Sequence, residues 1–202
     1  MNLFFDRLGV MKKLLAILIL ILTLPTPSQA DDIRDFQIEG ISVGDSLLDY
    51  FSEAEIKEEE KLFYPKSKKF YGITPSKKYE LYDDVSFILK SKDKDYKIYS
   101  IKGLIEYENK LNECLEEKDK ILKVVSNILK NSKEENYTND FEGSAGKSIA
   151  YISDFKASNG FIRVWCTDWD KKTEKEKNWY DSLNVNASTQ EFLDWLNNKA
   201  FK

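Results

Sequence analysis

Histidine is missing from the 202-residue chain, and two other residue types are scarce. The chain has only two cysteines, and it has three arginines against 28 lysines. Without histidine, the chain lacks the side chain that most often acts as a general base near neutral pH and most often binds transition metals. Two cysteines are too few for a thiolate zinc site. Oxygen ligands would suit calcium, but the run DWD at residues 168–170 continues into two lysines where ligands belong. We therefore predict no metal and no cofactor.

The absence of histidine also argues against a catalytic role for two serine motifs. Residues 44–47 spell GDSL, the string that names a family of lipases and esterases, and residues 40–44 match the nucleophile motif G-x-S-x-G. In both families a histidine activates the serine, so we reject a histidine-dependent hydrolase and interpret Asp45 or Ser46 as a helix cap. A hydrolase that pairs Ser42 or Ser46 with a lysine, or that uses paired carboxylates, stays open as the alternative function.

The triplet Gly146-Lys147-Ser148 resembles the end of a P-loop, but the first glycine of that pattern falls on Phe141. The residues that follow, 149–155, alternate as a strand, whereas a P-loop runs into a helix. We therefore predict a turn that enters a strand and reject a P-loop nucleotide site.

Long hydrophobic runs are absent apart from Leu14–Leu24, which has eleven residues and one polar member. As a helix this run would rise about 16 Å, roughly half the thickness of a bilayer core. Two lysines precede it and Ser28-Gln29-Ala30 ends the segment, a pattern typical of a secretory signal peptide cleaved after Ala30. We expect a signal peptide over 1–30 and a single globular domain over 31–202, with no stable membrane span after cleavage.

Acidic side chains outnumber basic ones. The chain has 31 Lys and Arg against 35 Asp and Glu, and without residues 1–30 the counts become 28 and 34. The resulting net charge of minus six disfavours nucleic acid and anionic lipid as partners. The leader begins at Met1 or at Met11, and either start leaves this balance unchanged.

An amphipathic helix is predicted over about 108–131. Within 111–129 the apolar side chains recur at spacings of three and four, which places them in one stripe that a sheet must cover. The stripe contains Cys114, and Cys166 lies on the apolar side of a predicted strand. In an exported chain this pair predicts one disulfide and an oxidising compartment, so that the protein is periplasmic or secreted. Two buried free thiols are the alternative.

The other patterns predict an α+β fold, in which antiparallel sheet packs against the helix at 108–131. Capping signals predict a pair of short N-terminal helices over 45–61 and a C-terminal helix that begins with the capping box Ser188-Thr189-Gln190-Glu191.

The polar stretch 131–147 predicts a flexible loop, and Asn159-Gly160 is typical of a type I′ hairpin turn. A second loop is predicted over 170–177. Alternating residues predict strands at 36–43, 70–73, 85–89, 96–107, 149–155, 161–167 and 179–186.

Residues 38–52, IEGISVGDSLLDYFS, resemble the opening of a group of small exported proteins from AT-rich marine bacteria. The resemblance extends over the leader, this segment and the tyrosine-rich strands that follow it. It implies export and implies no activity.

Aromatic residues are in surplus, with twelve Phe, eleven Tyr and four Trp. Exposed on a sheet face, such rings stack on sugars or bind peptides; in the alternative they fill both faces of the sheet. Trp165 is the leading candidate because strand alternation places it opposite Cys166. We predict a non-catalytic binding or envelope-accessory module whose partner is an envelope protein, a peptide or a glycan. The candidate binding face comprises Trp165, Trp169, Trp179 and Tyr180.

Overall fold

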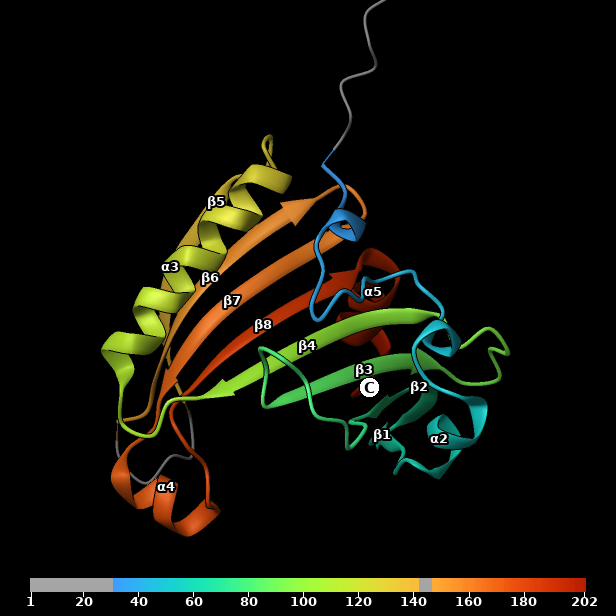
Figure 1. The fold of residues 1–202 in the computed structure, drawn as a ribbon, viewed down its shortest axis with the longest axis horizontal. Coiled ribbons are helices and arrows are strands. Elements are labelled where there is room, and N and C mark those ends of the chain that lie inside the picture. Colours follow the sequence, from blue (N-terminus) through green and yellow to red (C-terminus); the bar gives the residue numbers. More distant parts are fainter. Residues whose placement is uncertain (1–30, 142–146) are drawn as a thin grey trace, which may run out of the picture. The chain divides into compact units, whose positions relative to one another are not determined.

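The protein has an α+β fold, as predicted, with one eight-stranded antiparallel sheet and four α-helices in the part of the chain that the structure describes (Figure 1). The structure, a computed structural model, describes residues 31–141 and 147–202. They belong to one compact unit, Asp31–Lys202, and the predicted signal peptide lies outside the described residues. Among the described helices, none combines the length and the apolar character needed to span a bilayer.

The sheet joins two groups of strands through the last strand of the chain. Its order is β1-β2-β3-β4-β8-β7-β6-β5, so β8 enters between an N-terminal meander and a later group of hairpins. The strands are β1 (Leu62–Tyr64), β2 (Ser67–Ile73), β3 (Asp84–Lys90), β4 (Ile98–Glu106), β5 (Glu134–Asp140), β6 (Ile149–Ala157), β7 (Gly160–Asp168) and β8 (Ser182–Thr189). The helices are α2 (Glu53–Glu58), α3 (Leu111–Ile128), α4 (Lys171–Lys177) and α5 (Gln190–Lys199).

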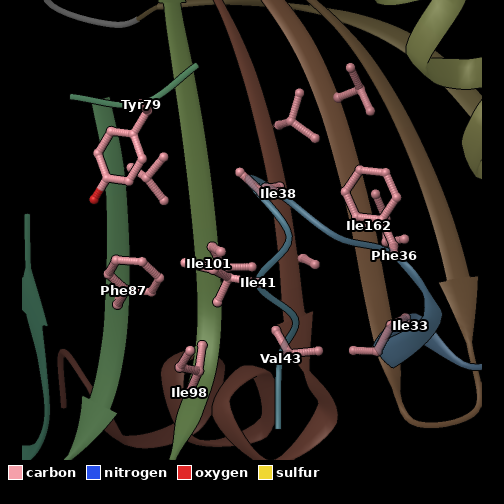
Figure 2. Close-up of a cluster of buried hydrophobic side chains, with 14 of the residues drawn as sticks. Ile33, Phe36, Ile38, Ile41, Val43, Tyr79, Phe87, Ile98, Ile101 and Ile162 are labelled. Atoms are coloured by element: carbon pink, nitrogen blue, oxygen red, sulfur yellow. The ribbon is translucent and has the colours of Figure 1, made fainter. Parts of the chain in front are cut away.

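The two faces of the sheet are covered differently. Helix α3 packs on β7 and β8, and the N-terminal segment 33–43 lies across the same face, which we call the covered face (Figures 1 and 2). Helix α5 contacts β4, β7 and β8 from the other side, which we call the open face. Because successive strand residues point to opposite faces, each strand contributes to both.

The covered face is a sealed apolar core. Ile33, Ile38 and Val43 of the N-terminal segment are fully buried and lie over Ile101 and Ile162 of the sheet (Figure 2). Burial of such side chains stabilises a fold by about 1.5 to 3 kcal/mol each. The predicted strand at 36–43 is wrong, because only an isolated bridge between Ile38 and Ile41 forms here.

Helix α3 and the sheet are joined by a disulfide between Cys114 and Cys166, both fully buried. The helix spans 111–128, a few residues inside the predicted range, and also buries Leu122 and Val125. A buried disulfide fits an oxidising environment outside the cytosol.

Several predicted elements differ from the structure. The predicted loop at 131–147 contains β5, an edge strand that pairs along its whole length with β6 although its sequence is almost entirely polar. The predicted loop at 170–177 is α4, because Asp170 caps the helix by accepting from the backbone N–H groups of Lys172 and Thr173. Edge strands and capped, charged helices form without a periodic pattern of apolar residues. The spacing of apolar residues therefore did not predict β5 or α4.

The helix starts were predicted with mixed success. The capping box of Ser52 and Glu55 opens α2, as expected. The first member of the predicted helical pair is only a 3₁₀ turn over Leu47–Asp49, capped by Ser46. In the C-terminal helix the cap is Thr189, the last residue of β8, which accepts from the Phe192 backbone N–H, whereas the Ser188 hydroxyl donates to Asn186.

The hairpin between β6 and β7 turns one residue earlier than predicted. Ala157 pairs with Gly160, so Ser158 and Asn159 form the two-residue loop. Asn159 does not have the positive φ that a type I′ turn requires. Its side chain instead accepts from the Ile33 backbone N–H, at 3.3 Å, which ties the N-terminal segment to the hairpin.

Candidate functional site

Three adjoining hollows lie on the open face, and Lys102 lines all of them. The aromatic hollow has a volume of about 320 Å³ and lies at the end of the sheet next to α4. The middle hollow, about 360 Å³, lies beside α5, and the apolar hollow, about 470 Å³, lies over β1 to β3. They join because α5 covers only one end of this face, against Phe70 and Tyr99. Together they form the Lys102 groove.

The aromatic hollow contains all four residues of the predicted binding face. Trp165, Trp169, Trp179 and Tyr180 line it together with Phe141. The ring centroids of Trp169 and Trp179 are 4.6 Å apart, and those of Phe141 and Trp169 are 4.8 Å apart. Trp179 is 46% exposed and Tyr180 is 38% exposed. The structure thus gathers rings from β7, from the residue that follows β5 and from the segments on both sides of α4 into one wall, which we call the aromatic wall.

Buried polar contacts hold the aromatic wall in place. The carboxylate of Asp181, at the start of β8, accepts from the Trp169 backbone N–H at 2.8 Å. Burial raises the pKa of Asp181. On the other side, Ser148 donates to Asp170 at 2.9 Å, and Asp170 caps α4. These contacts fix the positions of Trp169 and α4 relative to the sheet.

Lys102 is a cation that has no partner among the residues the structure describes. Its strand neighbours are Ser86 on β3 and Asn186 on β8, so it stands near the middle of the sheet. No hydrogen bond or ion pair reaches its ammonium group from any residue that the structure describes. Burial lowers the pKa of Lys102, and the negative charge of Asp84 opposes this shift without approaching to ion-pair distance. A desolvated charge without a partner destabilises a fold.

Arg163 is the other cation that lines the middle hollow, and it is paired. Its guanidinium donates two hydrogen bonds to Asp154, at 2.7 and 2.8 Å, and a third to the Tyr137 hydroxyl at 2.9 Å. These hydrogen bonds raise the pKa of Arg163. Arg163 and Lys102 both line the middle hollow, and of the described residues that line it none is acidic.

The floor of the Lys102 groove is made of neutral polar side chains. Asn186 donates to Ser100 at 2.8 Å, and Ser188 donates to Asn186 at 2.9 Å. Asn184 donates to Ser182 at 3.1 Å, next to the aromatic wall. Such amides and hydroxyls, fixed by one another, present oriented donors and acceptors to a ligand.

In the part of the chain that the structure describes, the serines of the hydrolase alternative do not hydrogen-bond to a lysine. Ser42 donates its hydroxyl to the Phe36 carbonyl at 3.2 Å, and Ser46 donates to the Asp95 carbonyl at 2.6 Å. Both hydroxyls are therefore engaged by the backbone. A serine that is to act as a nucleophile must instead donate to a base.

One Ser-Lys contact does occur, under α3. The Lys118 ammonium donates to the Ser153 hydroxyl at 2.7 Å, and burial lowers the pKa of Lys118. Ser153 is fully buried and donates in turn to Asn136. The contact lies in the packed layer between helix and sheet, where Lys118 is buried, so it satisfies a buried lysine.

No group of three or more potential metal ligands occurs among the residues the structure describes. Within the calcium-like run DWD, Asp170 is used as the cap of α4.

Sequence reasoning missed Lys102. It lies between Ile101 and Gly103, and alternation places it opposite the covered face. That signal is the same for any solvent-facing lysine of a strand. Only the insertion of β8 beside β4, far away in the sequence, puts Lys102 near the middle of the sheet.

The open face of the sheet is therefore an aromatic and polar groove, and the cation at its centre is unpaired within residues 31–141 and 147–202. No protein-family model, no curated protein and no solved structure matches this chain, so the site is interpreted from its own geometry.

Proposed function

We propose that this protein is an exported, non-catalytic binding module, periplasmic or secreted, that holds a glycan in the Lys102 groove. The observation that supports this most strongly is the convergence of Trp165, Trp169, Trp179 and Tyr180 on one hollow. Flat aromatic rings offer apolar surface to the C–H faces of sugar rings. Ligand sites typically combine such apolar walls with a few polar groups that set orientation, and Asn184 supplies one beside the aromatic wall.

A glycan fits this site better than an extended peptide. Peptides that add to a sheet pair with the free backbone groups of an edge strand. The aromatic and middle hollows lie over β3, β4, β8 and β7, whose backbone groups are already used by neighbouring strands. Side chains are therefore the available recognition groups, and here they are rings, amides and hydroxyls.

In this proposal the amphipathic helix α3 is the rigid backing of the binding face. It lies on the covered face, where the disulfide Cys114–Cys166 attaches it to β7. Trp165 directly precedes Cys166 on β7, and its side chain points to the open face. The disulfide therefore fixes the strand on which one wall of the groove is built.

The test is direct binding of oligosaccharides. The purified protein is titrated with envelope-derived oligosaccharides while tryptophan fluorescence is recorded, since three of the four tryptophans line the aromatic hollow. The double variant Trp179→Ala/Tyr180→Ala is expected to weaken binding about tenfold, which corresponds to about 1.4 kcal/mol. Leu81→Ala is the matched control, because Leu81 is 72% exposed and lies outside the groove.

Two outcomes would contradict the proposal. Unchanged affinity in the double variant would show that the aromatic wall is not the binding surface. Release of new reducing ends during the titration would favour the hydrolase alternative with paired carboxylates, for which Glu106 is a candidate because it lines the aromatic hollow. Burial and the nearby Asp83 and Asp84 raise the pKa of Glu106, as a general acid requires.

A further inference from the structure

The middle hollow is the positively charged part of the groove. Lys102 and Arg163 line it, and its other described lining residues are neutral. Arg163 already pairs with Asp154, at 2.7 Å, whereas Lys102 has no partner among the described residues. The described lining residues therefore leave one positive charge in excess, at a half-buried position.

We infer that the groove selects anionic glycans, with the charged group of one sugar residue held against Lys102 in the middle hollow. This inference rests on the proposed function and specifies its ligand class. An anionic group on the ligand would supply the partner that the ammonium lacks. Charge-assisted hydrogen bonds of this kind are roughly twice as strong as neutral ones.

The layout of the groove gives the ligand a direction. Trp165 lines both the aromatic hollow and the middle hollow. A sugar ring at the aromatic wall and a charged substituent at Lys102 therefore belong to adjoining parts of one site. At the far end of the aromatic hollow stands Glu106, whose carboxylate repels a second anionic group there. The expected ligand carries its charge on the residue nearest α5 and is neutral over the aromatic wall.

Burial supports the same conclusion. Lys102 costs stability as an unpaired, desolvated charge, and burial lowers its pKa. A neutral side chain of similar length would fill the same space without that cost. A recognition role explains why a lysine stands near the centre of the sheet.

The experiment compares oligosaccharides of one length that carry or lack an anionic group. Isothermal titration measures Kd for galacturonate tetrasaccharides, for their methyl esters and for sulfated galactan tetrasaccharides of the same length. Each is tested against the wild-type protein, against Lys102→Met and against Lys123→Met, whose lysine is exposed on α3. Methionine keeps the length of the side chain and removes its charge, and urea unfolding verifies that each variant is folded.

We expect the wild-type protein to bind at least one of the two anionic oligosaccharides at least tenfold more tightly than the neutral ester. In Lys102→Met this preference should fall to about twofold while the affinity for the ester is unchanged, and Lys123→Met should behave as wild type. The carboxylate and sulfate probes show which anionic group is recognised.

The outcomes separate this inference from the proposed function. Equal affinity for the ester and for both anionic oligosaccharides, or an unchanged preference in Lys102→Met, would overturn the inference and leave a module that binds neutral glycans. Absence of binding to every oligosaccharide, or binding only of an acidic peptide run alongside, would overturn both.

Discussion

The two faces of the sheet are made by the same strands and have opposite characters. On the covered face, β4, β7 and β8 present Ile101, Val164 and Val185, each fully buried. On the open face the same strands present Lys102, Trp165 and polar side chains around three hollows. The covered face supplies the stability of the fold, and this allows the open face to keep an unpaired charge and exposed rings.

Coverage explains the difference. The covered face is closed by an 18-residue helix and by the N-terminal segment. The open face is closed by a 10-residue helix that reaches one end only. A sheet face that remains partly uncovered tolerates polar and charged side chains, and these are the groups that recognise ligands.

The largest expected effect comes from breaking the covered face at its disulfide. The double variant Cys114→Ala/Cys166→Ala should lose about 4 kcal/mol of unfolding free energy, because the cross-link spans 52 positions of sequence and restricts the unfolded chain. Urea unfolding followed by circular dichroism measures this loss. The wild-type protein under strong reduction is the matched control and should show a similar decrease. Equal unfolding midpoints for the oxidised and the cysteine-free proteins would mean that the covered face needs no cross-link.

Two strand glycines allow a direct comparison of the faces. At Gly103 an added Cβ would lie 2.4 Å from the Tyr82 ring, which packs on the covered face. At Gly72 the nearest atom would be at an ordinary 3.5 Å, in the Ile88 side chain. We expect Gly103→Ala to destabilise the protein by about 1 to 3 kcal/mol through overpacking, whereas Gly72→Ala should be neutral or slightly stabilising. Thermal unfolding of both variants tests this, and equal losses would show that the two faces are packed equally tightly.

The smallest effect concerns buried tyrosines of the covered face at high pH. Burial raises the pKa of Tyr79 and of Tyr82 to about 12, from an ordinary value of 10.0. Because the folded state favours the neutral phenol, the stability that this contributes is fully present below pH 10 and is lost as the pH rises through 12. Unfolding free energy measured across this range should therefore decline.

Tyr79→Phe is the control for this decline. The Tyr79 hydroxyl is buried without a hydrogen-bond partner among the described residues, so phenylalanine removes an unsatisfied polar group as well as the titration. The variant should be at least as stable as wild type at neutral pH and should lose less stability above pH 10. An identical decline in the two proteins would assign the alkaline effect to other groups.

Much of the fold was predictable because its signals are local. The helix containing Cys114 has a regular apolar stripe, and Ser52 with Glu55 forms a complete capping box. The edge strand β5 had no such signal, since its exposed polar residues are held by pairing with β6 rather than by burial. Strict alternation along β4 would place Tyr99 on the same face as Ile101, which is the covered face. A bulge between Ile88 and Leu89 changes the register of the ladder, and Tyr99 packs under α5 instead.

By itself, the sequence determined which residues alternate on a strand, which stripe of the helix must be buried and which two cysteines were available to pair. These follow from the period of each element and from composition. Tertiary structure alone decided that Trp165, Trp169, Trp179 and Tyr180 meet in one hollow and that Lys102 lies beside them. The physical reason is that β8, the last strand, pairs with both β4 and β7. This pairing brings together side chains that are far apart along the chain, and no local pattern records it.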